Sequence, residues 1–122
     1  MLGLRTTIYK VSDLQKAKKW YTKAFSIAPY FDEPFYVGFN IKGYELGLLS
    51  EEDSIPKSDS VLSYWGVKNI EEEYLNFLEK GALVHEKPTH VGGEIWVASV
   101  KDPWNNVIGL IDNPHFKLPS SS

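Results

Sequence analysis

The chain carries the same order of strand-like and helix-like segments twice, and this repeat most constrains its fold. Aligning Val11 with Val67, 56 residues later, places TTIYKVSDLQKAKKWYTKAF over LSYWGVKNIEEEYLNFLEKG. Any two strand-helix units share some pattern, so chance resemblance is the alternative. Each copy, however, also ends on a Gly-Leu dipeptide inside a strand, in ELGLL and VIGLI. Internal duplication is the economical explanation, and it predicts two similar structural units.

The first copy predicts a strand, an amphipathic helix and three further strands. Ser12, followed three residues later by Gln15, forms a capping box that should begin the helix. The apolar face of this helix is expected at Leu14, Ala17, Tyr21, Ala24 and Phe25. Pro34 and the Lys42-Gly43 turn separate the last three strands. The four strands are expected at residues 4–11, 30–32, 35–41 and 44–49.

The second copy repeats this order after a polar linker at residues 50–60. Asn69, with Glu72 at the third position, should cap the second helix, and Gly81 should stop it. The apolar face of this helix is expected at Ile70, Tyr74, Phe77 and Leu78. The strands are expected at residues 61–67, 82–85, 94–101 and 107–111, with the turn DPWNN before the last. Glu71–Glu73 are interpreted as a solvated helix face.

Length and composition limit what the two copies can be. A chain of 122 residues fits one domain, so both copies should share it, as module one at 4–49, the linker at 50–60, module two at 61–112 and a tail at 113–122. A hydrophobic content of 43% is enough to form a folded core.

Charge and residue types exclude several classes of function. The net charge is −3 and the 13 Lys and Arg residues are scattered, so no basic stripe indicates a nucleic acid partner. The sequence predicts no membrane partner and a cytoplasmic location, since it has neither an apolar run of spanning length nor a signal-peptide pattern. The absence of cysteine excludes disulfides, thiolate nucleophiles and Cys-based metal sites.

Two motifs resemble a known family. The segments VSDLQKAKKWYTKAF and VKDPWNNVIGLID are similar to the glyoxalase / bleomycin-resistance / extradiol-dioxygenase superfamily, also called vicinal oxygen chelate proteins, and the similarity runs from Leu4 to Asp112. The resemblance implies an α+β fold in which two tandem βαβββ modules form a curled mixed sheet around one cleft that binds a small molecule. It also implies a homodimer, in which the modules pair within one chain or between chains.

The resemblance also implies where a metal would bind. Enzymes of the superfamily hold a divalent metal with one side chain from the first and last strand of each module. These positions fall on Thr6, Glu45, Leu62 and Gly109. Only Glu45 is a good ligand, because a threonine hydroxyl is a weak donor and leucine and glycine side chains offer none. We therefore expect no metal and no cofactor.

The histidines do not restore such a site. His85, His90 and His115 lack the HxH or HxxxH spacing that places two imidazoles on one face. They are interpreted as surface residues.

Strand alternation predicts the walls of the cleft, because residues two apart face the same side. The mainly apolar wall suits a small-molecule pocket. The expected ligand-binding residues are Thr6, Ile8, Glu45, Gly47, Leu62, Tyr64, Val97, Ser99 and Gly109.

Several of these residues have two interpretations. Glu45 is either a desolvated carboxylate with a raised pKa, suited to a general base or to a cationic ligand, or a remnant that pairs with Lys10 or lies in water. Tyr64 is either a stacking platform or a core tyrosine. Trp104 is a candidate dimer or pocket-rim contact. The other three tryptophans are assigned to the helix-sheet core, at Trp20, Trp65 and Trp96.

Three hypotheses for function follow from these features. The first is a protein that binds a small, partly aromatic or cationic molecule in its cleft without the superfamily's metal. The second is a lyase or isomerase that uses Glu45 as base with atypical or no metal. The third is a partner-binding module whose cleft is vestigial.

Overall fold

The computed structural model describes residues 4–52, 57–58 and 61–115. The chain divides into two compact units, Met1–Ser58 and Asp59–Ser122, and each is described by itself. The division falls inside the linker predicted at 50–60. Linker residues 53–56 and 59–60, and residues 116–122 of the predicted tail, lie outside the described residues. Within the described residues, no helix has the length and apolar character needed to cross a membrane.

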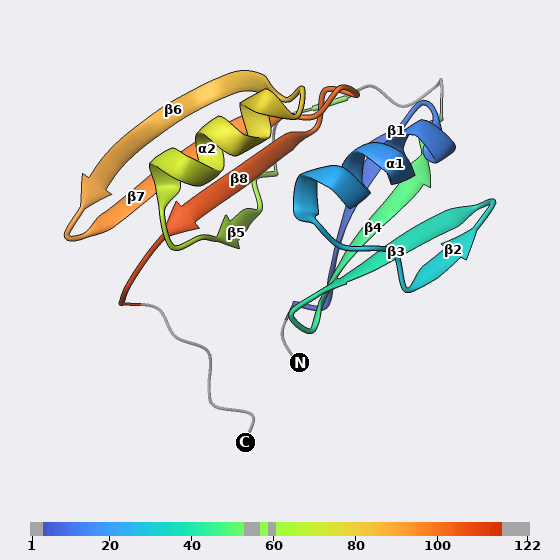
Figure 1. Cartoon of the computed structure of the whole chain (residues 1–122), viewed down its shortest axis with the longest axis horizontal. Helices are drawn as coiled ribbons and strands as arrows, with labels where there is room; N and C mark the ends of the chain where they lie inside the picture. Colours follow the sequence, from blue (N-terminus) through green and yellow to red (C-terminus); the bar gives the residue numbers. More distant parts are fainter. Residues whose placement is uncertain (1–3, 53–56, 59–60, 116–122) are drawn as a thin grey trace. The chain divides into compact units, whose positions relative to one another are not determined.

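The first unit is a four-stranded mixed sheet with one helix on one face (Figure 1). The strands lie in the order β1-β4-β3-β2; β1 and β4 are parallel and the other neighbours antiparallel. The elements are β1 (Thr6–Val11), α1 (Leu14–Phe25), β2 (Phe31–Glu33), β3 (Tyr36–Ile41) and β4 (Tyr44–Ser50).

The apolar face of α1 packs against this sheet as its spacing predicts. The buried helix residues are Leu14, Ala17, Tyr21 and Ala24. The Tyr21 ring stacks on that of Tyr9 from β1, with centroids 5.8 Å apart. The buried sheet residues on this side are Tyr9, Val11, Val37, Phe39, Leu46 and Leu48. The helix begins one residue later than expected, because Asp13 rather than Ser12 is the cap and accepts a hydrogen bond from the backbone N–H of Lys16.

The second unit repeats the order of the first. Its strands lie as β5-β8-β7-β6, with β5 and β8 parallel and the other neighbours antiparallel, and α2 lies across one face (Figure 1). The elements are β5 (Tyr64–Gly66), α2 (Ile70–Glu79), β6 (Leu83–Gly92), β7 (Ile95–Lys101) and β8 (Val107–Asp112). Each unit thus has the order βαβββ and the same strand arrangement, which confirms the predicted fold class. A cleft shared by the two modules stays a prediction.

The predicted ends of α2 are confirmed. The Asn69 side chain accepts a hydrogen bond from the backbone N–H of Glu72 at 3.1 Å. The helix ends at Glu79, and Gly81 has a φ of 100°, a conformation that residues with a side chain rarely adopt. Within the helix, Ile70, Tyr74 and Phe77 are buried.

Two strands of the second unit differ in length from the prediction. β5 covers Tyr64–Gly66 rather than residues 61–67, so Leu62 precedes the strand. β6 runs to Gly92 rather than ending at His85, because it pairs with β7 along its whole length through three register shifts. Pro88 is tolerated there because β6 is an edge strand.

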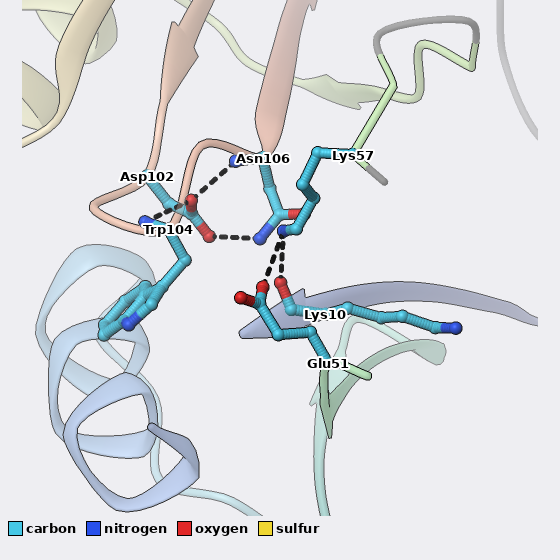
Figure 2. Close-up of polar contacts among 6 residues, drawn as sticks. All are labelled: Lys10, Glu51, Lys57, Asp102, Trp104 and Asn106. Atoms are coloured by element: carbon cyan, nitrogen blue, oxygen red, sulfur yellow. Dashed lines mark hydrogen bonds and ion pairs between the residues drawn. The ribbon is translucent and has the colours of Figure 1, made fainter. Parts of the chain in front are cut away.

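The turn between β7 and β8 is closed by Asp102, whose side chain is fully buried. Its Oδ1 accepts hydrogen bonds from the backbone N–H groups of Trp104 and Asn106, at 2.9 and 2.7 Å (Figure 2). Its Oδ2 accepts one from the Asn106 side chain at 2.8 Å. The Asp102 N–H also donates to the Asn106 carbonyl, as the DPWNN turn predicts.

In the first unit, Lys57 joins the linker to the end of β1. Its Nζ donates to the Lys10 carbonyl at 2.5 Å and lies 3.5 Å from the Glu51 carboxylate (Figure 2). This lysine therefore fixes part of the linker to the first sheet.

Candidate functional site

The candidate site lies on the face of the first sheet opposite α1, here called the helix-free face. Because side chains alternate along strands and Tyr9, Phe39 and Leu46 point toward α1, their neighbours point the other way. The residues of the helix-free face are Thr6, Ile8, Lys10, Tyr36, Gly38, Asn40, Glu45, Gly47 and Leu49. The two predicted positions of the first module, Thr6 and Glu45, are direct partners across β1 and β4.

Two glycines make the surface on which the site is built. Gly38 and Gly47 are partners across β3 and β4. A Cβ on Gly47 would strike the Tyr36 hydroxyl and lie 2.8 Å from its Cζ, so the Tyr36 ring lies directly over this glycine. A Cβ on Gly38 would meet three side chains: Glu45 Oε2 at 2.9 Å, Tyr30 Cε1 at 3.2 Å and Tyr36 Cε2 at 3.3 Å. The missing side chains therefore let two phenol rings and one carboxylate converge on the sheet.

Four residues form the site, Thr6, Tyr30, Tyr36 and Glu45, which we call the Glu45 cluster. The Thr6 hydroxyl donates a hydrogen bond to Glu45 Oε1 at 2.8 Å. The Tyr30 hydroxyl donates to Glu45 Oε2. The Tyr36 ring lies beside the same carboxylate above Gly38, and its hydroxyl makes a small contribution to lowering the pKa of Glu45. β1, β3, β4 and the segment before β2 thus each supply one side chain.

These contacts shift the pKa values of the cluster in opposite directions. The hydrogen bond from Tyr30, then that from Thr6, lowers the pKa of Glu45, since both stabilise its charged form. Partial burial, followed by the charge of Glu45, raises the pKa of Tyr36 to about 12. The hydrogen bond to Glu45 raises the pKa of Tyr30. At neutral pH the cluster therefore holds one ionised carboxylate beside two protonated phenols.

This result corrects one expectation for Glu45. A raised pKa was expected on an apolar wall, but three hydroxyl groups make the surroundings of Glu45 polar and its pKa falls. Within the residues that the structure describes, Glu45 forms no ion pair, so the suggested pairing with Lys10 is wrong.

The residues at the superfamily's four metal positions do not fit a divalent metal. Tyr64 pairs with Gly109 in the second sheet, just as Ile8 pairs with Gly47 in the first. Gly109 is therefore the counterpart of Gly47. The counterpart of Glu45 is Val107, two residues before the predicted position. The side chains of Val107 and Leu62 have no atom that can bind a metal, and Gly109 has no side chain. The Gly109 N–H already donates to the Ser63 carbonyl at 3.0 Å.

Glu45 alone cannot replace the missing ligands, because one carboxylate supplies only one of the four side-chain ligands that the resemblance implies. No group of three or more His, Asp or Glu residues that could hold a metal occurs in the described part of the chain.

The predicted wall residues of the second unit form a separate group. A Cβ on Gly109 would lie 2.8 Å from Tyr64 Cδ1 and 3.2 Å from Leu62 Cδ1, so both side chains lie over this glycine. Tyr64 is 42% exposed, which excludes a core tyrosine. It lines a hollow of about 840 Å³ together with Gly66, Val67, Lys68, Ile111, Asp112, Asn113 and Pro114.

Ser99 and Val97 are buried on β7, and Ser99 contacts a histidine. Its Oγ lies 2.7 Å from His85 Nδ1, and His85 lies at a register shift of β6. His85 is exposed, as expected of a surface residue, and its ring also contacts a buried hydroxyl.

Two other aromatic expectations change. Trp96, expected in the helix-sheet core, is 38% exposed, and its ring centroid lies 5.2 Å from that of His90. His90 is itself held by the Gly93 carbonyl, which accepts a hydrogen bond from its Nε2 at 2.6 Å. Trp20 and Trp65 are half-buried.

Tyr30 and Tyr36 were not among the predicted site residues, although both lie beside the Glu45 carboxylate, which was predicted.

The two βαβββ units and their register define a class of protein. The family model described as Glyoxalase/Bleomycin resistance protein/Dioxygenase superfamily matches residues 3–110. The chain therefore belongs to this superfamily, as its motifs suggest.

Solved structures of low sequence identity share the fold. A glyoxalase-related enzyme from Fulvimarina pelagi has a TM-score of 0.77 at 16% identity, covering 98% of this chain and 94% of that chain. A member of the superfamily from Sphaerobacter thermophilus has a TM-score of 0.76 at 18% identity, covering 93% and 98%. A lactoylglutathione lyase from Agrobacterium tumefaciens has a TM-score of 0.68 at 16% identity, covering 92% and 94%. No curated protein sequence matches this chain. At these identities the likeness extends to the fold alone.

Proposed function

We propose that the protein binds a small organic molecule at the Glu45 cluster, without the divalent metal of the superfamily's enzymes. One observation carries the proposal: the carboxylate at the metal position is surrounded by hydroxyl donors and aromatic rings instead of further metal ligands. Convergent polar groups beside apolar surface are the usual make-up of a small-molecule site.

The alternative of a lyase or isomerase that uses Glu45 as base receives no support from the site. A carboxylate that removes a proton near neutral pH needs a raised pKa. The hydroxyls of Tyr30 and Thr6 lower the pKa of Glu45 and so weaken it as a base.

A thermal-shift experiment on the full chain tests the proposal. We expect at least one class among small amines, phenols and carboxylic acids to raise the melting temperature in the presence of EDTA. The rise should disappear in Glu45→Gln and persist in Glu79→Gln, which removes an exposed carboxylate at the end of α2. Stabilisation that requires an added divalent metal would overturn the proposal, as would a panel in which no compound stabilises the protein.

The superfamily resemblance also supports two broader proposals. We propose a homodimer, for which light scattering should give twice the mass of the chain; a monomeric mass at micromolar concentration would contradict it. We also propose a cytoplasmic location, which cell fractionation would test by finding the protein in the cytosolic fraction rather than in another compartment.

A further inference from the structure

We infer that the molecule recognised by the Glu45 cluster is a protonated amine with an adjoining apolar or aromatic group. This inference rests on the proposed function and narrows it to one chemical class. It depends on three properties of the cluster: unused acceptor capacity, uncompensated charge and the arrangement of the two rings.

The carboxylate of Glu45 can accept more hydrogen bonds than the protein donates. An ionised carboxylate has about four acceptor sites. Thr6 fills one on Oε1 and Tyr30 one on Oε2, while Tyr36 contributes weakly. A ligand that donates N–H groups can therefore bind without displacing Thr6 or Tyr30. A ligand that only accepts hydrogen bonds cannot use the remaining sites.

The negative charge of Glu45 is not neutralised by a described side chain. Its protein partners are neutral hydroxyls, and within the described residues it forms no ion pair. Lys10 lies on the same face but is paired with Leu49, four residues along β4 from Glu45, or about 13 Å at the usual strand rise. A positive ligand would supply the missing charge, whereas an anion would be repelled.

The two tyrosine rings supply the rest of the recognition surface. The edges of both rings and the carboxylate approach the same point above Gly38, within 3.3 Å of the position of a Cβ. Tyr30 is 62% exposed, so the cluster can be reached from its side. An ammonium group bound to Glu45 would bring the apolar or aromatic group attached to it next to the rings of Tyr30 and Tyr36, which can contact that group.

The test compares benzylamine, which is protonated at neutral pH, with benzyl alcohol, which has the same ring and no charge. Each is titrated into the ¹⁵N-labelled full chain, and the backbone amide signals of Gly38 and Gly47 report on the site. We expect both signals to shift and saturate with benzylamine, with at least about fivefold weaker binding of benzyl alcohol. Glu45→Gln should weaken amine binding by about fivefold or more, and Glu79→Gln should leave it unchanged.

Each contrary outcome has a defined meaning. Equal affinity for the amine and the alcohol at Gly38 and Gly47 would overturn the amine inference while leaving the proposed function intact. Shifts confined to other residues, or no shift with either compound, would overturn the amine inference. Because the comparison of the two compounds uses the unmodified protein, a folding defect in Glu45→Gln would not rescue the inference.

Discussion

Glu45 is stabilised as an anion by groups that carry no charge. Hydroxyl donors lower its pKa and keep the site negative, whereas a lysine partner would lower the pKa and remove the net charge. This difference separates a cluster that can attract a cation from an internal ion pair that is already neutral.

The lowered pKa of Glu45 makes a prediction about acid stability. The unfolded carboxyl titrates near 4.5, so Glu45 contributes stability above that pH and loses it as the pH falls through its lower folded value. Between about pH 6 and pH 3, the free energy of unfolding in urea should therefore fall less in Glu45→Gln than in the wild type. Glu79→Gln serves as the control and should fall as the wild type does; an equal fall in all three proteins would contradict the assigned contacts.

Gly47 should control the position of the Tyr36 ring. In Gly47→Ala the new Cβ would strike the phenol, so the ring must move off the sheet and away from Glu45. The pKa of Tyr36, about 12 in the native protein, should then fall toward its usual value of 10.0. A phenolate absorbance titration measures this change, and Tyr36→Phe identifies the signal. An unchanged high-pKa tyrosine in Gly47→Ala would show that the ring does not depend on this glycine.

Sequence reasoning identified Glu45 but could reach its partners only in part. The turn at Lys42-Gly43 fixes the pairing of β3 with β4, and counting back from it places Tyr36 on the face of Glu45. Tyr36 was therefore predictable. Tyr30 precedes β2, and its reach across Gly38 depends on the path of the chain before that strand. The direction of the pKa shift depends on both tyrosines and could not be derived without them.

At the scale of the elements, the repeat itself contains the correct helix start. The offset that aligns Val11 with Val67 also aligns Asp13 with Asn69, and both cap their helices. Ser12 was predicted as the cap of the first helix because Ser and Gln at this spacing match a capping box. Comparing the two copies position by position also corrects the last strand. Aligning ELGLL directly with VIGLI pairs Glu45 with Val107 rather than with Gly109.

A pair of substitutions tests the cap of α1. Asp13→Ala should lower the free energy of unfolding by about 1 kcal/mol, because the backbone N–H of Lys16 loses its acceptor. Ser12→Ala should change it by no more than a few tenths of a kcal/mol. Urea denaturation of both variants decides between the two caps. A larger loss of stability in Ser12→Ala than in Asp13→Ala would show that Ser12 is the cap.

The β7–β8 turn should depend strongly on Asp102. Asp102→Ala would leave three hydrogen-bond donors of Trp104 and Asn106 without this buried acceptor, so we expect a loss of about 3 kcal/mol in urea denaturation. Asn105→Gly is the matched control in the same turn, because Asn105 has a φ of 72° that glycine adopts freely. A loss below about 1 kcal/mol for Asp102→Ala would show that the turn is held by other contacts.

The strand lengths show where local patterns stop being informative. Three register shifts continue the pairing of β6 with β7 past His85, and such shifts leave no simple alternation in the sequence. β5 is short although residues 61–67 carry a strand-like pattern. Pairing with a neighbouring strand decides both lengths.

The whole molecule has the superfamily's fold, whereas the residues at the metal positions that the resemblance implies do not fit a divalent metal. Solved structures at 16–18% identity share this fold, so the fold persists through wide changes in sequence. The fold class was predictable because duplicated helix faces and turns encode it redundantly. A ligand site depends on a few side chains, and the proposed site depends on Glu45 and its neighbours.

We propose above that the Glu45 cluster binds an organic molecule where the superfamily's enzymes bind a metal. The most direct measurement is the electron density beside Glu45 in crystals of the full chain grown with both zinc and benzylamine. We expect density for the amine, with its nitrogen within hydrogen-bonding distance of Glu45 and beside the rings of Tyr30 and Tyr36. A zinc ion coordinated by Glu45, identified by its anomalous scattering, would show instead that the cluster is a metal site.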